Sequence, residues 1–195
     1  MQAPTQARVR VAAGLADAGF SSLRLGGTPV LSNVSSPGVT QYVLVPAGTH
    51  SVGLTVGGVV LADTTKKLDD GGDYTLVMHG TANAPVPAWV VDDNTLPSDR
   101  TRAKLRLVNG VSGVAGALSL AVDFLPVAGS VMPGSATAYD LVPAASATAQ
   151  LTVTAEGLAA PLYFAVDQTL SAGANYTVFM LRGADNATGV LRKDR

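Results

Sequence analysis

Few residues of this 195-residue chain have the types and spacing that chemistry requires. There are two histidines, His50 and His79, and no cysteine. A nucleophilic triad needs a Ser or Cys, a His and an acid brought together, and the serines near His50 in sequence show no such pattern. Without cysteine there is no disulfide framework and no thiolate zinc site. Metalloprotease, dinucleotide and P-loop motifs are also absent from the sequence. We therefore expect both histidines to be surface or strand-end residues of a non-enzymatic protein without a cofactor.

Acidic residues gather in one polar, Pro-containing stretch, residues 92–101, DDNTLPSDRT. Carboxylate and amide oxygens are the ligands that hard cations prefer. A cation could therefore be held between two domains by a set of four residues: Asp92, Asp93, Asn94 and Asp99. The alternative, which the polar composition favours, is a solvated linker.

The single tryptophan, Trp89, lies in the apolar segment VPAWVV. It is either a core residue or an exposed platform on which a sugar ring could stack. The core interpretation is favoured, because large aromatic side chains dominate the buried area of protein cores.

One segment occurs twice and points to the fold. Residues 68–78 read LDDGGDYTLVM and residues 170–180 read LSAGANYTVFM. The pattern Leu-x-x-Gly-x-Asp/Asn-Tyr predicts a tyrosine corner, in which a Tyr hydroxyl bonds to the backbone a few residues upstream, and the Gly supplies a positive φ. The acids at 69, 70 and 73 are an alternative calcium site, but the second copy does not repeat them. The predicted corner residues are Leu68, Gly71 and Tyr74, and Leu170, Gly173 and Tyr176.

Other segments repeat as well, which predicts two domains. The segment YVLVPAG at residues 42–48 recurs in similar form as YDLVPAA at residues 139–145. Each copy opens with an alternating strand, with Arg8 and Arg10 on the polar face of the first copy, and Lys104 and Arg106 on that of the second. We expect these basic residues to keep an exposed strand soluble. The predicted boundaries are 1–94 and 102–195 for the domains and 95–101 for the linker.

The charge content and the lengths of the apolar runs exclude some classes of function. Only 14% of the residues are charged and the formal net charge is −1, which gives no general attraction to nucleic acid. No run approaches the roughly 20 apolar residues of a membrane helix. The start, MQAPTQ, lacks the charged and apolar regions of a signal peptide and has the polar character of a segment left after cleavage. We expect an exported protein.

Short strands with turn signals every 8 to 12 residues, and no sustained helical periodicity, are typical of an antiparallel β-sandwich. The order of segments Ala-Arg-Val-Arg-Val, Val-Leu-Ser-Asn-Val, Tyr-x-x-Val-Pro-Ala-Gly-Thr and Leu-x-x-Gly-x-Asp-Tyr-Thr resembles the DUF4397 domain, a bacterial module of unknown function. This resemblance implies two tandem Greek-key sandwiches, immunoglobulin-like or transthyretin-like, in an exported protein. It implies no catalytic residue.

The residues and the resemblance together predict a non-catalytic structural or interaction protein at the cell surface or in an extracellular assembly. Its partners would be other surface proteins or further copies of itself, in a filament or layer. The alternative is a carbohydrate-binding module that uses Trp89.

Overall fold

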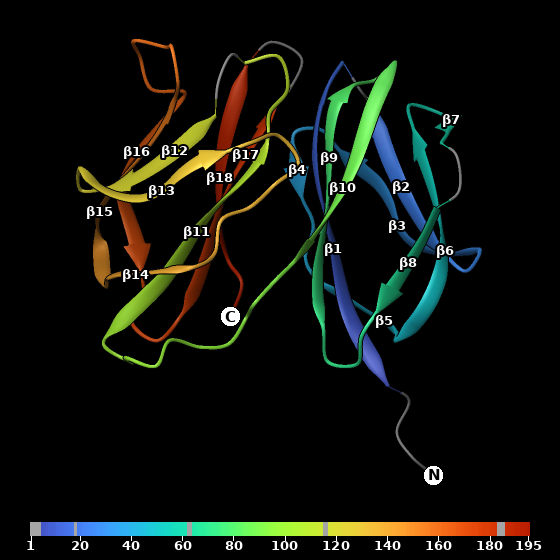
Figure 1. Cartoon of the computed structure of the whole chain (residues 1–195), viewed down its shortest axis with the longest axis horizontal. Helices are drawn as coiled ribbons and strands as arrows, with labels where there is room; N and C mark the ends of the chain where they lie inside the picture. The colour runs from blue at the N-terminus through green and yellow to red at the C-terminus, as the bar shows by residue number, and fades with distance from the viewer. Residues whose placement is uncertain (1–4, 18, 62–63, 115–116, 183–185) are drawn as a thin grey trace.

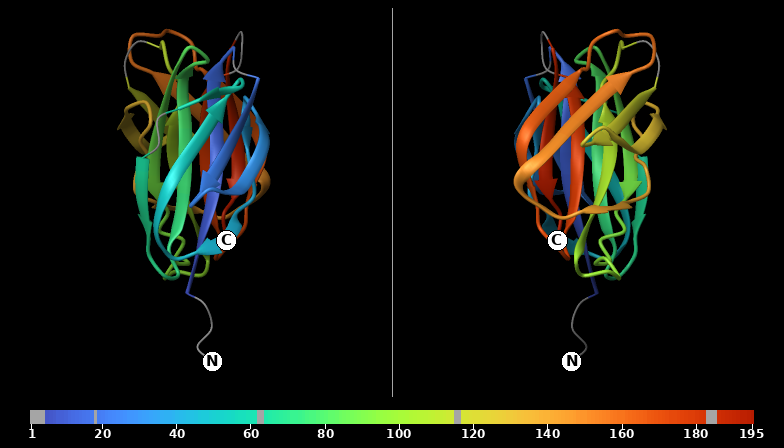
Figure 2. Two further views of the ribbon diagram at one scale, coloured as in Figure 1. Left: turned by 90° about the vertical axis from the view of Figure 1, so that its right-hand side faces the viewer. Right: turned by 90° about the vertical axis from the view of Figure 1, so that its left-hand side faces the viewer.

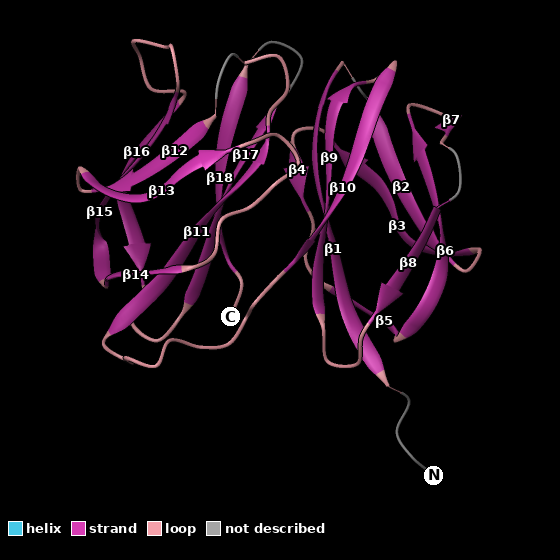
Figure 3. Cartoon of the chain, viewed as in Figure 1, coloured by secondary structure: helices cyan, strands magenta, loops and turns pink. Residues whose placement is uncertain are grey.

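The computed structural model describes residues 5–17, 19–61, 64–114, 117–182 and 186–195. All regular secondary structure in these ranges is β-strand, as the sequence predicts (Figure 3). Most of the N-terminal start lies outside the described residues. The strands form four sheets that stack as four layers from left to right in Figure 1.

The first sandwich is built from the first ten strands. Its inner sheet, which faces the second sandwich, contains β10 (Ala84–Val91), β9 (Asp73–Thr81), β1 (Gln6–Ala16), β4 (Gly38–Val39) and β5 (Val43–Pro46). Its outer sheet contains β3 (Thr28–Ser35), β2 (Phe20–Leu25), β6 (Gly48–Val56), β7 (Val59–Val60) and β8 (Thr64–Leu68). Alternate apolar residues of both sheets, such as Val9 and Leu54, form one closed core between them.

The second sandwich repeats this plan after a loop at residues 92–101. Its inner sheet has the order β14 (Asp140–Pro143), β11 (Arg102–Gly110), β17 (Asn175–Arg182) and β18 (Ala187–Lys193). Its outer sheet has the order β13 (Leu125–Val131), β12 (Leu118–Val122), β15 (Ala145–Ala155) and β16 (Tyr163–Leu170). A separate core that includes Leu105 and Leu151 fills the space between them. The two views of Figure 2 look onto the outer sheets from either side.

The two inner sheets are mixed, whereas the strand pairs of the two outer sheets are antiparallel. β1 pairs parallel with β9, and β11 pairs parallel with β17, with Arg8 opposite Asp73 and Lys104 opposite Asn175. The chain crosses to the outer sheet and returns before it forms β9 or β17, so the returning strand runs in the direction of the first one. A parallel pair needs such a long crossover, which a hairpin cannot supply.

Each repeated Leu-x-x-Gly segment has the geometry of a tyrosine corner. The Tyr74 hydroxyl accepts a hydrogen bond of 2.9 Å from the Asp69 backbone N–H, and the Tyr176 hydroxyl accepts one of 2.9 Å from that of Ser171. Gly71 and Gly173 have φ values of 71° and 73°, a region that residues with a side chain rarely adopt. Leu68 and Leu170 are buried in the two cores. The corner therefore fixes the crossing from outer to inner sheet in each sandwich.

Replacing Tyr74 by Phe should lower the free energy of unfolding by about 1 kcal/mol, because the Asp69 N–H loses its acceptor. Urea denaturation followed by circular dichroism measures this change. Tyr163→Phe is the matched control, since the Tyr163 hydroxyl makes no hydrogen bond with the described residues. Equal midpoints for the two variants would contradict the corner's role.

Candidate functional site

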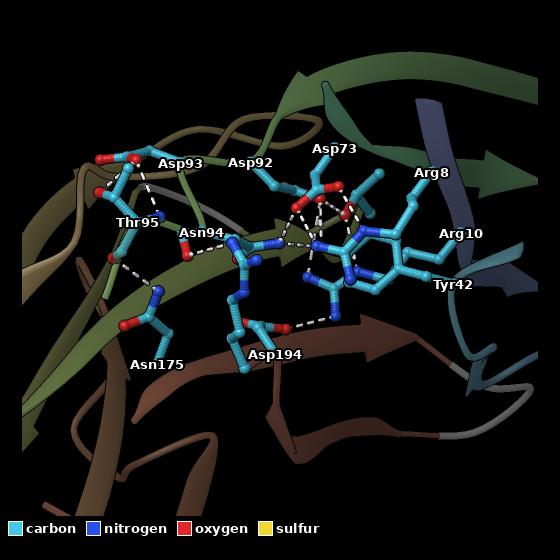
Figure 4. A network of polar contacts seen from close by, with 12 residues as sticks. Arg8, Arg10, Tyr42, Asp73, Asp92, Asp93, Asn94, Thr95, Asn175 and Asp194 are labelled. Atoms are coloured by element: carbon cyan, nitrogen blue, oxygen red, sulfur yellow. Dashed lines mark hydrogen bonds and ion pairs between the residues drawn. The ribbon is translucent and has the colours of Figure 1, made fainter. Parts of the chain in front are cut away.

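The two inner sheets pack against each other, and this interface holds most of the unusual chemistry of the described chain. Its apolar part is a small buried cluster that joins Ala12 and Val77 of the first sandwich to Val108, Phe179 and Leu181 of the second. Its polar part is the network drawn in Figure 4. The sandwiches are therefore joined by a packed interface as well as by the chain.

Two arginines lie inside this interface. The exposed fractions of Arg10 on β1 and Arg106 on β11 are 2% each. The expectation that these residues keep an exposed strand soluble is wrong for both. The reason is that the polar face of each first strand is covered by the other sandwich and does not meet water.

Each buried arginine binds an acid that belongs to the other sandwich. The Arg106 guanidinium, from the second sandwich, donates to Asp92, which follows the last strand of the first. The Arg10 guanidinium, from the first sandwich, donates to Asp194, which follows the last strand of the second. Arg10 Nη2 also lies 3.8 Å from Asp92 Oδ2. A buried charge is costly unless it is paired and hydrogen-bonded. Each guanidinium here has an acid partner and a hydrogen bond across the interface, and Arg10 Nη2 is the one guanidinium nitrogen of the two arginines that is buried without a hydrogen-bond partner among the described residues.

Within each sandwich a Tyr and a Thr orient the acid. Asp92 accepts hydrogen bonds of 2.6 Å from the hydroxyls of Tyr42 and Thr75. Asp194 accepts bonds of 2.7 Å and 2.5 Å from the hydroxyls of Tyr139 and Thr177. These bonds satisfy the carboxylate lone pairs that the arginines leave free.

The arginines also lie against aromatic rings. The guanidinium carbon of Arg10 is 4.3 Å from the Tyr42 ring centroid and 4.7 Å from that of Phe179, and Arg106 lies 4.5 Å from Tyr139. Distances below about 6 Å are favourable for a cation over an aromatic face.

The electrostatics of the network hold Arg106 in the charged state. Burial, the largest single cause, lowers the pKa of Arg106, but the charges of Asp92, Tyr139 and Asp194 and the hydrogen bond to Asp92 together outweigh it, so the pKa is raised overall. Burial, with the nearby charge of Asp92, raises the pKa of the Tyr42 hydroxyl well above its ordinary value. Tyr42 therefore stays a hydrogen-bond donor at any physiological pH.

The interface has pseudo-twofold symmetry. Arg10 lies opposite Thr75 in the β1–β9 register, and Arg106 lies opposite Thr177 in the β11–β17 register. The Nε of each arginine donates to the Thr opposite it, at 2.8 Å and 2.9 Å. Matching residues of the two sandwiches thus make matching contacts in both directions, as in an isologous dimer interface.

Two glycines at matching positions allow the inner sheets to approach closely. A Cβ placed on Gly14 of β1 would lie 2.5 Å from the carbonyl oxygen of Gly110 on β11. A Cβ on Gly110 would lie 2.9 Å from a methyl carbon of Leu181. These strands therefore touch backbone to backbone, which only glycine permits at this point.

The structure does not bring the four predicted cation ligands together. Asp92 and Asn94 are buried in the network, whereas Asp93 and Asp99 are exposed and accept hydrogen bonds from Thr95 and Thr101. The described residues contain no cluster of three or more His, Cys, Asp or Glu suited to a metal ion. Asp92 is instead bound to cationic arginine side chains, which take the place that a metal ion would occupy.

Asn94 shows that the connector between the sandwiches is not simply solvated. Its side-chain nitrogen donates to Asp73 Oδ2 at 2.7 Å, and its side-chain oxygen accepts from the Tyr139 hydroxyl at 3.2 Å. Asp73, one of the alternative calcium ligands, is also paired with Arg8. The loop therefore contributes to the interface that it crosses.

The histidines lie apart from each other. His50 Nε2 is 2.9 Å from the Pro46 carbonyl oxygen at the surface. His79 Nδ1 lies 3.1 Å from the Ser112 hydroxyl of the other sandwich, and that hydroxyl accepts a bond from the Gly80 N–H. Burial lowers the pKa of His79. Among the described residues no carboxylate is hydrogen-bonded to either ring, so neither histidine forms a triad with them.

Trp89 lies in β10 and packs, partly buried, against the core of the first sandwich. The Lys66 ammonium is 5.6 Å from its ring centroid. This placement agrees with the core interpretation.

The sequence alone did not reveal the network, although one signal was available. Both copies place an Arg in the first strand, a Thr directly after the corner Tyr, and an Asp just after the last strand. Polar residues that both copies of a diverged repeat retain on one face can be read as a contact between the copies.

The fold and this interface define a class: an all-β protein of two sandwiches joined by a buried, pseudo-symmetric ionic interface. A family model described as a domain of unknown function, DUF4397, matches residues 7–121, more than half of the chain. The chain therefore belongs to the DUF4397 family. The match covers the first sandwich and the first strands of the second. No curated protein sequence matches the chain significantly. Among the described residues, no helix is long and apolar enough to cross a membrane.

Asp92→Ala should lower the free energy of unfolding by about 3–5 kcal/mol, because it leaves Arg106 buried without its carboxylate. Its sequence neighbour gives the control: the Asp93 side chain is 66% exposed, and Asp93→Ala should cost less than about 1 kcal/mol. Urea denaturation monitored by the fluorescence of Trp89 compares the two. Similar losses for both variants would show that the interface does not depend on the ion pair.

Gly14→Ala should force the inner sheets apart, since its Cβ would meet backbone atoms that cannot give way; overpacking of this kind costs about 1–3 kcal/mol. We expect faster tryptic cleavage after Arg100 in the connecting loop. The control is Gly19→Ala, where a Cβ meets no heavy atom within 4 Å. Unchanged cleavage of the Gly14 variant would mean that the close approach is dispensable.

Proposed function

We propose that this protein is a non-catalytic, exported structural subunit that acts at the cell surface or in an extracellular assembly by associating with copies of itself or with other surface proteins. The observation that carries the proposal is the buried ionic interface. Because each sandwich supplies the acid for the other's arginine, the two sandwiches form one rigid body with outer sheets at its opposite ends.

The placement of the polar chemistry supports a non-catalytic role. The buried charged groups Arg10, Arg106, Asp92 and Asp194 are all bonded inside the interface. An active site usually exposes such groups in a pocket that a substrate can enter. Charges that are fully used in holding domains together support a structural function.

The surface distribution of apolar residues supports association. Large apolar side chains are exposed on the outer sheet and hairpin of the second sandwich, with exposed fractions of 82% for Phe124, 64% for Leu125 and 57% for Phe164. A cavity of about 470 Å³ on that sheet is lined by Leu120, Pro126 and Val127 among others. Exposed apolar surface of this kind marks interaction sites.

The proposal also treats the second sandwich as a second copy of the family domain, with an immunoglobulin-like or transthyretin-like arrangement in each. The matching registers β1–β9 and β11–β17, and the two tyrosine corners, support this. The proposal that the protein is exported rests on the family resemblance. The carbohydrate hypothesis stays a prediction, and the partial burial of Trp89 does not favour it.

Self-association is tested with the purified chain across a wide concentration range. We expect its mass, measured by light scattering after size exclusion, to rise with concentration, and ordered chains or layers to be visible by electron microscopy. Imaging of the native protein on its cell checks the location. A chain that stays monomeric at high concentration and forms no ordered assembly would contradict self-association.

A further inference from the structure

Each sandwich has a groove at the same place, between a hairpin of its outer sheet and an edge strand of its inner sheet. In the first sandwich the groove lies between the β2–β3 hairpin and β5 and encloses about 360 Å³. In the second it lies between the β12–β13 hairpin and β14 and encloses about 250 Å³. Apolar residues at matching positions line both, including Val30, Leu44 and Val45 in the first groove.

The two hairpin tips differ sharply although their positions match. The first tip is Gly26-Gly27, with φ values of 56° and 80°, and the second is Asp123-Phe124, with φ values of 48° and 68°. A two-residue turn of this type favours Asn or Gly because both central residues need φ above zero. A bulky residue there is a conformational outlier.

Packing within the chain does not offset this backbone strain. The exposed fraction of Phe124 is 82%, and that of its neighbour Leu125 is 64%. Residues with a strained backbone conformation cluster at functional sites, where the strain is part of the function. Phe124 is therefore displayed at the tip of its hairpin as an apolar knob.

The charged side chains near the first groove and beside the knob have opposite signs: Arg24 is cationic, whereas Asp123 and Asp140 are anionic. Arg24 donates to the Gly27 carbonyl oxygen at the rim of the first groove, and His50 lines that groove. Asp123 and Asp140 are exposed beside the knob. Ala121 and Ala147 stand at the positions that match Arg24 and His50. Gly26 and Val43 stand at the positions that match Asp123 and Asp140, and none of these four residues is charged. Arg102 also lies near the knob, but its guanidinium donates to the Leu141 carbonyl oxygen. Opposite charges on two docking surfaces favour their association and fix its register.

The groove also has room for the knob. An apolar cavity of about 150 Å³ holds a benzene ring, so 360 Å³ can accept the Phe124 ring with part of Leu125. The first groove is the larger of the two, and its rim is formed by glycines instead of Asp123 and Phe124.

We propose that the Phe124 hairpin of one copy inserts into the first-sandwich groove of the next copy, with Asp123 and Asp140 facing Arg24 and His50. The two hairpins lie at opposite edges of the molecule along its longest axis (Figure 1). A head-to-tail contact between different surfaces that does not close on itself generates an open filament. The inference rests on the self-association proposed above and names the surfaces that produce it.

Two variants remove one surface each. Phe124→Gly removes the knob and relieves the positive φ, so its melting temperature should equal or exceed that of the unchanged protein. Leu44→Asp places a carboxylate at the rim of the first groove, at a residue that is 65% exposed. Phe20→Ser, an aromatic residue that is 60% exposed at the far end of β2 from the hairpin, is the matched control.

Each of the first two variants should self-associate at least about tenfold more weakly, because burial of a Phe or Leu side chain is worth more than a decade in Kd. The control should assemble like the unchanged protein. An equimolar mixture of the two variants should form a heterodimer that grows no further, because one variant supplies only the groove and the other only the knob. Light scattering after size exclusion measures all four samples.

The outcomes separate the two proposals. If the unchanged protein stays monomeric, self-association fails and this inference fails with it. If it assembles and Phe124→Gly assembles equally well, the inference is overturned while self-association stands. If both variants are monomeric but their mixture yields no heterodimer, the head-to-tail pairing is overturned.

Discussion

The arrangement of the whole molecule depends on the burial of two arginines between two sandwiches. The side chains of Arg10 and Arg106 are at most 3% exposed, and a guanidinium does not deprotonate at physiological pH. Each must therefore have a carboxylate partner within reach. Because Asp194 and Asp92 come from the opposite sandwiches, the pairing is satisfied only when the two sandwiches lie in one relative orientation.

Such pairs contribute orientation more than stability. A buried ion pair gains little over a well-packed apolar contact, while losing one partner is strongly destabilising. The apolar cluster around Phe179 supplies favourable burial, but apolar surfaces can slide and repack. The arginine pairs, with the backbone contact at Gly14, penalise every displaced arrangement. One relative orientation of the two sandwiches follows from this combination of non-directional burial and directional pairing.

The sequence predicts the strands and the tyrosine corners well, because these depend on local pattern: alternation along a strand, a Gly with positive φ and a Tyr five residues after its partner. It does not predict what covers a polar face. Period-two alternation separates Arg10 from Val9 and Val11, yet it is the same whether the outward face meets water or another domain. For the same reason the sequence predicts a cation site or a solvated loop at Asp92 and Asn94, since it does not show which distant cation lies opposite an acid. The parallel pairing of β1 with β9 also depends on topology, which local sequence pattern does not determine.

The two sandwiches match where they face each other and differ where they face outward. At the interface, matching Arg, Thr, Tyr and Asp residues are needed on both sides, because a change on one side leaves a buried charge on the other unpaired. The outer hairpins have no such mutual constraint, and they carry Gly26-Gly27 at one end and Asp123-Phe124 at the other. The interface between the two sandwiches is symmetric, but the two outer hairpins are unlike. The molecule therefore has two different ends. A contact between two different ends is heterologous, and a heterologous contact that does not close on itself gives a polar filament, whereas a contact between two identical ends gives a closed dimer.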